Sequence, residues 1–600
     1  MDENLTQSQI GRAAWIGLAA ILVFFHLGLI FSGLIPNLVS RPLHMALALP
    51  WIFLFGAKRG WPLMSGLVLT VLGGGAAIWI AVNHEMLGDQ YGFVEGWFQT
   101  GVAIVLLITV IEAARRAIGW PLPLVATLAL AYALWGQHIP GEFGHAGTPL
   151  PSFLGNMTIA EGGIWGSLTA VSVGVVSIFV IFGAVLNAGE AGQGFMNVAA
   201  AAAGRLKGGA AKVSVLSSAL FGSISGSASA NVASTGAITL PAMTRLGYPK
   251  QLAAGVEAVA SSGGQIMPPL MGAGAFVMVE LTGTPYTTIM SAAILPAILY
   301  FWAVWVGINA YATRFELRGI AAGEQPATRD VIITSLFFLM PFTVLMLGMF
   351  AYGYTPQYAA CLAIIVGAFL LMFDGHFHFD LARAGQRCAL AFISAARQVA
   401  MIASIILCAS IVIGVLGVTG LGIKITSLIL SGSSGMLWPS LVLTALACLV
   451  LGMEVPTTAA YVICVSVAGP ALMQLGLEPL QAHLFVFWFA LLSTITPPVC
   501  GAVFIAAGMI GENWVKVAIT AMSLGLGLYI IPMGMIANPA ILTLSTAPGA
   551  AILAFAQIGL GLALISHGAI ARGPTLFRLF AGVAGMLVIF LPSVLMPFLS

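Results

Sequence analysis

Long apolar runs constrain what this chain can fold into more than any other feature. Trp15 to Leu34, Pro62 to Val82 and Ile332 to Phe350 each contain no charged residue. The hydrocarbon core of a bilayer is about 30 Å thick, and about 20 apolar residues cross it as an α-helix. Only 7% of the chain is charged, whereas soluble domains carry roughly 25%. The sequence therefore predicts an all-α polytopic membrane protein.

Each apolar run predicts one membrane span. The N-terminus is acidic and lacks a small-residue cleavage site, which favours a retained first span over a signal peptide. The expected spans are 14–34, 43–57, 62–82, 98–118, 121–137, 164–188, 250–282, 287–310, 330–352, 358–373, 398–418, 480–510, 514–535, 546–566 and 575–597.

Two further apolar stretches, 208–245 and 436–475, are broken in the middle and are predicted to be re-entrant hairpins. With a cytoplasmic N-terminus and both hairpins returning to their own side, only Arg41 and Lys424 of the 21 Lys and Arg residues fall outside. The other 21 − 2 = 19 follow the positive-inside rule. Arg383 and Arg387 belong to an expected cytoplasmic loop at 374–387.

The two broken regions form an internal repeat. The first reads SGSASANVASTGAITLPAMTRLGYP and the second VPTTAAYVICVSVAGPALMQLGLEP. Pro241 and Pro470 are 470 − 241 = 229 residues apart, and the same offset relates the Pro-Pro and Gly-Ala pairs that follow. Because the hairpins enter from opposite sides in this topology, the repeats are expected to be inverted. Carriers built this way bind their solute at the midplane, where the repeats meet.

The hairpin tips and the breaks in the following spans carry the candidate ligands. Irregular backbone inside a membrane must be buried in protein or line a wet cavity, where its carbonyls can coordinate Na⁺. The candidate ion-binding residues are Ser225, Ser227, Ser229, Asn231, Ser261, Gly263, Gly264, Gln265, Glu454, Thr457, Thr458, Ser493, Thr494 and Thr496. Proline removes an N–H and clashes with the preceding turn. The expected helix-break residues are Pro268, Pro269, Pro456, Pro497 and Pro498.

Four half-helix N-termini would converge at these breaks. Each carries a charge of about +0.5, so the arrangement favours an anionic solute. Any single serine could instead be a packing residue between helices. As a set, the breaks coincide with the repeat, which favours binding. Glu454 is an acidic residue in an apolar stretch, which is typical of function; the alternative is a wet hairpin tip that solvates it.

The stretch from Gly204 to Pro269, GRLKGGAAKVSVLSSALFGSISGSASANVASTGAITLPAMTRLGYPKQLAAGVEAVASSGGQIMPP, resembles the large membrane subunit of TRAP (tripartite ATP-independent periplasmic) transporters. LGMEVPTTAAY and HLFVFWFALLSTITPPVCGA resemble the second half of the same family, and RPLHMALAL near the N-terminus is similar to a fused small subunit. The likeness is to the fused permease, in which both membrane subunits form one chain, of the TAXI type.

The resemblance implies an elevator-type carrier driven by an ion gradient, usually Na⁺, with a periplasmic TAXI-type binding protein that delivers a carboxylate. It implies a division into 1–140, a scaffold like the small subunit; 141–375, the first repeat; 376–540, the second repeat; and 541–600, C-terminal helices. Position 454 is usually small and position 494 is often aspartate in this family, whereas this chain has Glu454 and Thr494. The hypothesis is that Glu454 replaces the missing charge, or that this protein couples to H⁺.

Other functions fit the sequence less well. A channel needs a continuous polar pore, whereas the polar residues here cluster at two related points. HExxH, GxSxG with a partner His, and GxxxxGK[ST] are absent from the sequence, which argues against an enzyme and an ATP-driven pump. The sequence has no basic patch that would indicate nucleic-acid binding. A carrier of related architecture that needs no binding protein is the second hypothesis. We expect an inner-membrane monomer in contact with lipid and without a cofactor.

Overall fold

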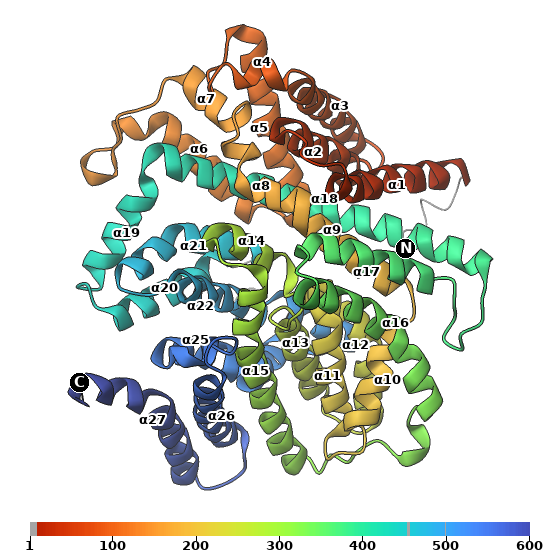
Figure 1. Ribbon diagram of the computed structural model, residues 1–600. Helices are drawn as coiled ribbons and strands as arrows, with labels where there is room; N and C mark the ends of the chain where they lie inside the picture. The colour runs from red at the N-terminus through yellow and green to blue at the C-terminus, as the bar shows by residue number, and fades with distance from the viewer. Residues whose placement is uncertain (1–8, 453–455, 498–499, 600) are drawn as a thin grey trace.

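The computed structural model describes residues 9–452, 456–497 and 500–599 (Figure 1), and all regular elements in these ranges are helices. Ten of these helices or continuous helical stretches are long and apolar enough to cross a membrane. The predicted all-α, multi-pass membrane protein is therefore confirmed. Glu454 and Pro498 lie outside the described residues.

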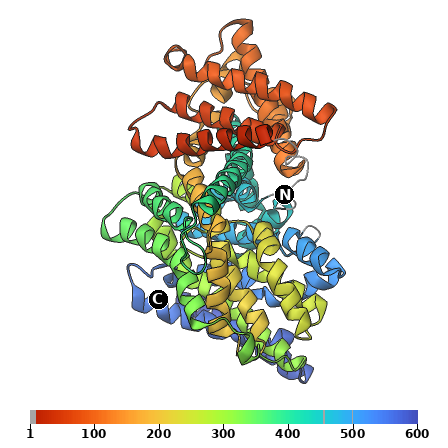
Figure 2. The same ribbon diagram turned by 90° about the vertical axis from the view of Figure 1, so that its right-hand side faces the viewer.

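The N-terminal helices form the upper part of the molecule in both views (Figures 1 and 2). They are α1 (Gln9–Phe31), α2 (Asn37–Phe53), α3 (Trp61–Val82), α4 (His84–Gly88), α5 (Gly96–Ile118), α6 (Pro121–Trp135) and α7 (Leu150–Thr158). Several of these helices have a proline at their first or second position, where its fixed φ suits the first turn and its missing N–H needs no partner. Pro62 in α3 and Pro121 in α6 are examples.

The middle of the chain holds the first repeat and its flanking helices. They are α8 (Ser167–Val171), a π-helical turn at Ser172–Val176, α9 (Ser177–Ala188), α10 (Ala191–Ala203), α11 (Gly209–Ser225), α12 (Ala228–Arg245), α13 (Lys250–Gly264), α14 (Gly272–Thr282), α15 (Tyr286–Arg314), α16 (Thr328–Met346), a π-helical turn at Leu347–Ala351, and α17 (Pro356–Leu370). Short 3₁₀ turns lie at Gly136–His138, Gly141–Phe143, Gly163–Trp165, Ala322–Glu324 and Pro539–Leu542.

The second repeat and the C-terminal helices complete the fold. They are α18 (Leu381–Thr419), α19 (Leu421–Gly432), α20 (Leu437–Leu451), α21 (Thr457–Gln474), α22 (Pro479–Leu492), α23 (Gly501–Ile510), α24 (Trp514–Leu524), α25 (Leu526–Ala537), α26 (Pro548–Ile570) and α27 (Thr575–Leu599). Helix α18 lies between the N-terminal helices and the rest of the molecule (Figure 1) and packs on α1, α2, α5, α6 and α9.

The helix bounds reproduce the sequence repeat. Helices α12, α13 and α14 begin at 228, 250 and 272, and α21, α22 and α23 begin at 457, 479 and 501. Each pair differs by 229, since 457 − 228 = 479 − 250 = 501 − 272 = 229. Both regions 208–245 and 436–475 consist of two consecutive helices, and both following spans are interrupted where the Pro-Pro pairs stand. The predicted helix pairs and interrupted spans are therefore present among the described residues, and the re-entrance of the hairpins stays a prediction.

Several expected boundaries were wrong. The span at 398–418 is part of α18, which begins at Leu381, so the loop expected at 374–387 is half helical. Asp380 caps α18 by accepting a hydrogen bond from the Arg383 N–H. The expected start was too late because it was placed by the apolar run, which begins only in later turns of the helix. The expected span at 514–535 is confirmed by the apolar helical stretch Trp514–Ala537, which a turn at Gly525 divides into α24 and α25. Helices α7, α10 and α19 were missed because they are too short for a span.

Contacts between distant loops agree with the predicted sidedness. Lys424 Nζ donates to the Gly144 carbonyl, and Asn37 donates to Glu161 at 2.7 Å; all four positions fall outside in the predicted topology. Residues placed inside also meet, since Arg387 forms an ion pair with Glu190. These three contacts are consistent with the predicted sidedness, which stays a prediction.

Candidate functional site

The two hairpins and the two helix breaks meet around one cavity of about 400 Å³. The cavity is lined from the first repeat by the end of α11, the start of α12 and the break between α13 and α14. From the second repeat it is lined by the start of α21 and the break between α22 and α23. The opposite wall comes from α5, the region of α9 and α18. Elements that are hundreds of residues apart thus form one site.

The first hairpin approaches the broken helix backbone to backbone. A Cβ at Gly222 would lie 2.4 Å from the Gly264 Cα, so neither position has room for a side chain. At the tip, Gly226 has φ +61° and a Cβ there would lie 2.7 Å from the Gly272 Cα. Glycine is therefore required at Gly222 and Gly226 by close approach, and at Gly226 also by the left-handed backbone.

Gln265 links the two repeats. Its Nε2 donates to the Gly226 carbonyl at the first hairpin tip at 2.8 Å, and its Oε1 accepts from Thr457 of the second hairpin at 3.1 Å. The equivalent residue of the second repeat is Thr494, since 494 − 265 = 229. Its Oγ1 lies 2.8 Å from the Ser262 Oγ, with Thr494 as the donor. Each helix break is thus hydrogen-bonded to the opposite repeat.

The hairpin tip offers oxygen atoms that suit a small cation. The Ser225 Oγ is buried and has no hydrogen-bond partner among the described residues. Ser227 caps α12, its Oγ accepting from the Ala230 N–H at 3.3 Å. A buried hydroxyl without a partner costs free energy, and a hard cation is bound by oxygen ligands of this kind. The residues at this tip therefore fit an Na⁺ ion.

The predicted site residues fall into two sets. Those that line the cavity are Ser225, Ser227, Ser229, Gln265, Pro456, Thr457, Thr458, Ser493 and Thr494. Those described but placed behind this lining are Asn231, Ser261, Gly263, Gly264, Pro268, Pro269, Thr496 and Pro497. The second set supports the first: Asn231 donates to the Ser218 and Ser261 carbonyls, and Thr496 shares a hydrogen bond of 2.7 Å with Tyr529.

The opposite wall of the cavity was not predicted from the sequence. Gln398, Met401, Ile402 and Ile405 of α18 line the cavity, together with Phe179 of α9. These residues lie in ordinary-looking apolar spans, and only their positions in three dimensions bring them to the site. The Gln398 amide at an otherwise apolar stretch of α18 is the one signal that could have indicated it.

A fully buried carboxylate fixes the first hairpin. Glu257 of α13 is 0% exposed and accepts hydrogen bonds from five hydroxyls. Its partners on α11, α12 and its own helix are Ser214 at 2.7 Å, Ser218 at 3.3 Å, Ser261 at 3.3 Å, Thr235 and Thr239. No Lys, Arg or His forms an ion pair with Glu257 in the part of the chain that the structure describes. The hydroxyls therefore solvate the carboxyl group inside the protein.

The second hairpin is instead held by contacts between aromatic side chains. The Tyr461 hydroxyl of α21 lies 2.7 Å from the His483 Nδ1 of α22, and the Tyr461 ring meets Phe487 edge to face with 5.5 Å between centroids. The residues equivalent to Thr235 and Glu257 are Cys464 and Val486, both buried. One Tyr–His hydrogen bond and apolar packing thus replace the hydroxyl cluster.

Comparisons with known proteins give the family. The profile of the "Tripartite ATP-independent periplasmic transporter, DctM component" matches residues 105–550. The chain is 25% identical over 343 residues to the C4-dicarboxylate TRAP transporter large permease protein DctM of Pseudomonas aeruginosa, covering 56% of this chain and 77% of the relative. It is 24% identical over 373 residues to the isethionate TRAP transporter permease protein DctMQ of Oleidesulfovibrio alaskensis, covering 61% and 57%.

A third relative is the 2,3-diketo-L-gulonate TRAP transporter large permease protein YiaN of Escherichia coli, 24% identical over 348 residues, with 56% of this chain and 77% of the relative covered. The matched relatives are transporter components, and the prediction that the chain is not an enzyme is confirmed. Permeases of this family work with a periplasmic substrate-binding protein. Since the family profile spans both hairpins and both breaks, the chain belongs to the TRAP transporter family and contains its large permease component.

Proposed function

We propose that this chain carries a small organic anion, with carboxylates as the preferred class, into the cytoplasm at the expense of an ion gradient. The observation that supports this most is the single cavity at which both hairpin tips and both helix breaks meet. Relatives are named for C4-dicarboxylate, isethionate and 2,3-diketo-L-gulonate, all of which are anions. The solute of this chain belongs to the same chemical class.

The coupling ion in this proposal is Na⁺, bound at the hairpin tips. The unpartnered Ser225 hydroxyl and the carbonyl groups around Gly226 supply hard oxygen ligands. H⁺ is the alternative ion, with Glu454 as the group that carries it. A Glu454→Gln variant separates the two, because it abolishes proton-driven transport and leaves Na⁺-driven transport through the first hairpin in place.

The cavity suggests an elevator movement. One wall belongs to the hairpins and breaks that repeat with the offset of 229, and the other to α5, α9 and α18, which lie outside the segments related by that offset. A solute held by the hairpins can therefore be carried past a static wall, with the hairpins re-entering the membrane from opposite faces. The N-terminus is cytoplasmic in this arrangement, and residues 1–140 brace the static wall as a fused small subunit would.

The proposed partner is a periplasmic binding protein of the TAXI type. A test reconstitutes the full chain in liposomes and measures uptake of labelled C4-dicarboxylates, with and without a periplasmic binding protein of the TAXI type, under an imposed Na⁺ gradient. Uptake that requires both the gradient and the binding protein supports the proposal. Uptake without the binding protein would favour the carrier that works alone, and ion-independent flux that does not saturate would indicate a channel.

A further inference from the structure

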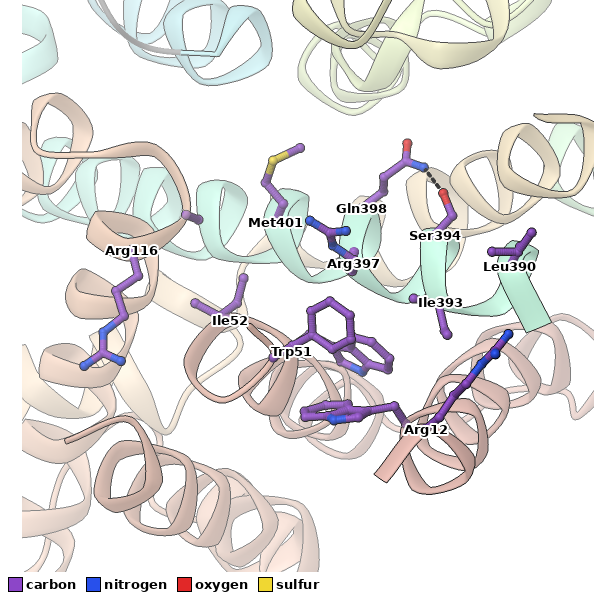
Figure 3. Close-up of a pocket in the computed structure, with 13 residues that line it drawn as sticks. Arg12, Trp51, Ile52, Arg116, Leu390, Ile393, Ser394, Arg397, Gln398 and Met401 are labelled. Carbon is purple, nitrogen blue, oxygen red and sulfur yellow. Dashed lines mark hydrogen bonds between the residues drawn. The ribbon is translucent and has the colours of Figure 1, made fainter. Parts of the chain in front are cut away.

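A second cavity lies between the N-terminal helices and α18 (Figure 3). Its volume is about 550 Å³, and it is lined by Arg12, Trp15, Trp51, Ile52, Phe55, Arg116, Ala117, Leu390, Ile393, Ser394, Arg397, Gln398 and Met401. Among the residues that the structure describes, the lining contains three cations and no acidic residue. It thus combines positive charge with a mainly apolar surface.

Two of the three cations are available to a ligand. Arg116 is engaged, because it forms an ion pair with Glu112 at 2.8 Å and donates to the Pro62 carbonyl at 2.9 Å. Arg12 is exposed, and Arg397 lies over the Phe55 ring at 5.2 Å from its centroid. Neither Arg12 nor Arg397 forms an ion pair with a carboxylate within residues 9–452, 456–497 and 500–599.

A buried donor in the same cavity also lacks an acceptor. Trp51 is 4% exposed, and its Nε1 has no hydrogen-bond partner among the described residues. Its indole packs against Trp15 and Phe55, with centroids 5.0 to 5.1 Å apart between the three rings. Figure 3 places Trp51 beneath Arg397 on the face of α18 that also carries Ile393. A buried N–H without an acceptor is costly, and an oxygen of a bound anion would satisfy it.

The chemistry of the walls selects the kind of anion. Ile52 and Ile393 are apolar, and Leu390 at the edge is 47% exposed, so a ligand with a hydrocarbon part is favoured over a fully hydrated one. Arg12, Trp51 and Arg116 stand at the start of α1 and the ends of α2 and α5, the ends that the charge pattern assigns to the cytoplasmic face. Basic pockets between membrane helices on that side bind anionic lipid headgroups.

We propose that this cavity is a binding site for an anionic phospholipid. Arg12 and Arg397 hold the phosphate, the Trp51 Nε1 donates to one of its oxygens, and an acyl chain lies along the apolar wall that Ile52 and Ile393 form. The lipid joins the N-terminal helices to α18 and is separate from the solute cavity, which borders this site only at Ala117, Gln398 and Met401.

The test measures lipid binding directly. Full-length protein in a mild detergent is titrated with phosphatidylglycerol, phosphatidylcholine or inorganic phosphate, and the bound molecules are counted by native mass spectrometry. The variant is Arg12→Gln with Arg397→Gln. The matched control is Lys58→Gln with Arg59→Gln, which removes two exposed cations at the same end of the helices but outside the cavity.

The expected result is a preference for phosphatidylglycerol that falls roughly 30-fold in the arginine pair variant, since each cation near a lipid phosphate contributes about fivefold. The control pair retains the preference. Trp51→Phe keeps the ring, removes the N–H and weakens binding by about fivefold. Equal binding of the two lipids, an unchanged arginine pair variant, or inorganic phosphate that competes at the same concentration as phosphatidylglycerol would each overturn the proposal.

Discussion

The first and second hairpins share a backbone plan and differ in how they are held. Helices α12 to α14 repeat in α21 to α23 with a constant offset of 229, and Gly247 and Gly476 both adopt positive φ after the hairpins. Yet Glu257 and its five hydroxyls fix the first hairpin, whereas the second relies on Tyr461, His483 and apolar neighbours. The shared residues are those that the backbone path requires, and the side chains that fill the contacts are free to differ.

The difference also separates the two halves of the cavity. In the first half, the polar cluster continues from Glu257 through Thr235 to Asn231, whose side chain reaches the carbonyls beside the break. In the second half, the corresponding positions are Cys464 and Val486, and α21 is linked to α22 by the Tyr461–His483 hydrogen bond instead. We therefore expect substitutions in the first hairpin to have the larger effects.

The largest effect is expected from Glu257→Val, which gives the first repeat the residue that the second has at 486. Five buried hydroxyls lose their acceptor, and even after some turn to backbone carbonyls the protein should lose about 3 kcal/mol of stability. Thermal unfolding in detergent measures the change. Glu257→Gln retains an acceptor oxygen and should lose less. A Glu257→Val protein as stable as the parent would show that the cluster does not hold the hairpin.

The next effect concerns Gly222. Gly222→Ala places a methyl group against the Gly264 backbone, so the hairpin must move away, and such overpacking costs about 1–3 kcal/mol. The equivalent position 451 in the second repeat is leucine, and there Gly452 makes a looser approach to the broken helix, with a Cβ 3.2 Å from the Ser493 Cβ. The control is Gly417→Ala in α18, where a Cβ meets nothing within 4 Å. Equal melting temperatures of Gly222→Ala and Gly417→Ala would show that the close approach of Gly222 to the Gly264 backbone does not constrain the hairpin.

A smaller effect is expected where the repeats meet. Gln265→Leu removes both hydrogen bonds that join the hairpin tips, and the initial uptake rate in liposomes should fall about tenfold, which corresponds to about 1.4 kcal/mol. Thr494→Val removes the single hydrogen bond from the second break to Ser262 of the first repeat and should lower the rate by less. The decisive readout is which variant loses more of the initial uptake rate. A larger loss in Thr494→Val than in Gln265→Leu would place the main link in the second repeat.

The smallest effect is expected from Tyr461→Phe. It removes one hydrogen bond to His483 and keeps the ring against Phe487, so the loss of stability should be about 1 kcal/mol. Circular dichroism during heating gives the value. A loss as large as that of Glu257→Val would mean that the second hairpin depends on polar contacts as much as the first.

The sequence predicted the elements whose signal is local. Apolar run length identified the spans, and the Pro-Pro pairs with the offset of 229 identified the breaks and hairpins. Two features could not be found in this way. The length of α18 depends on a cap at Asp380 and on packing against the N-terminal helices. The wall of the cavity depends on which face of α18 meets the hairpins, and hydropathy contains no such information.

Only some of the predicted site residues line the cavity. Residues at tips and breaks, such as Ser225 and Thr457, reach the cavity because the break itself places them there. Asn231 and Ser261 have the same composition signal but point into the packing between α11, α12 and α13. Helical phase decides between the two roles, and a polar residue type alone does not give that phase.

The central claim is that the hairpin tips bind the coupling cation, and the most direct test is the melting temperature against Na⁺ at constant ionic strength with choline. A ligand at 100 times its dissociation constant stabilises the protein by about 2.7 kcal/mol. We predict a saturable, Na⁺-specific rise that Ser225→Ala shifts to higher Na⁺, while Ser223→Ala, whose hydroxyl already bonds the Leu220 carbonyl, leaves it in place. A melting temperature indifferent to Na⁺ in the parent protein would contradict the claim.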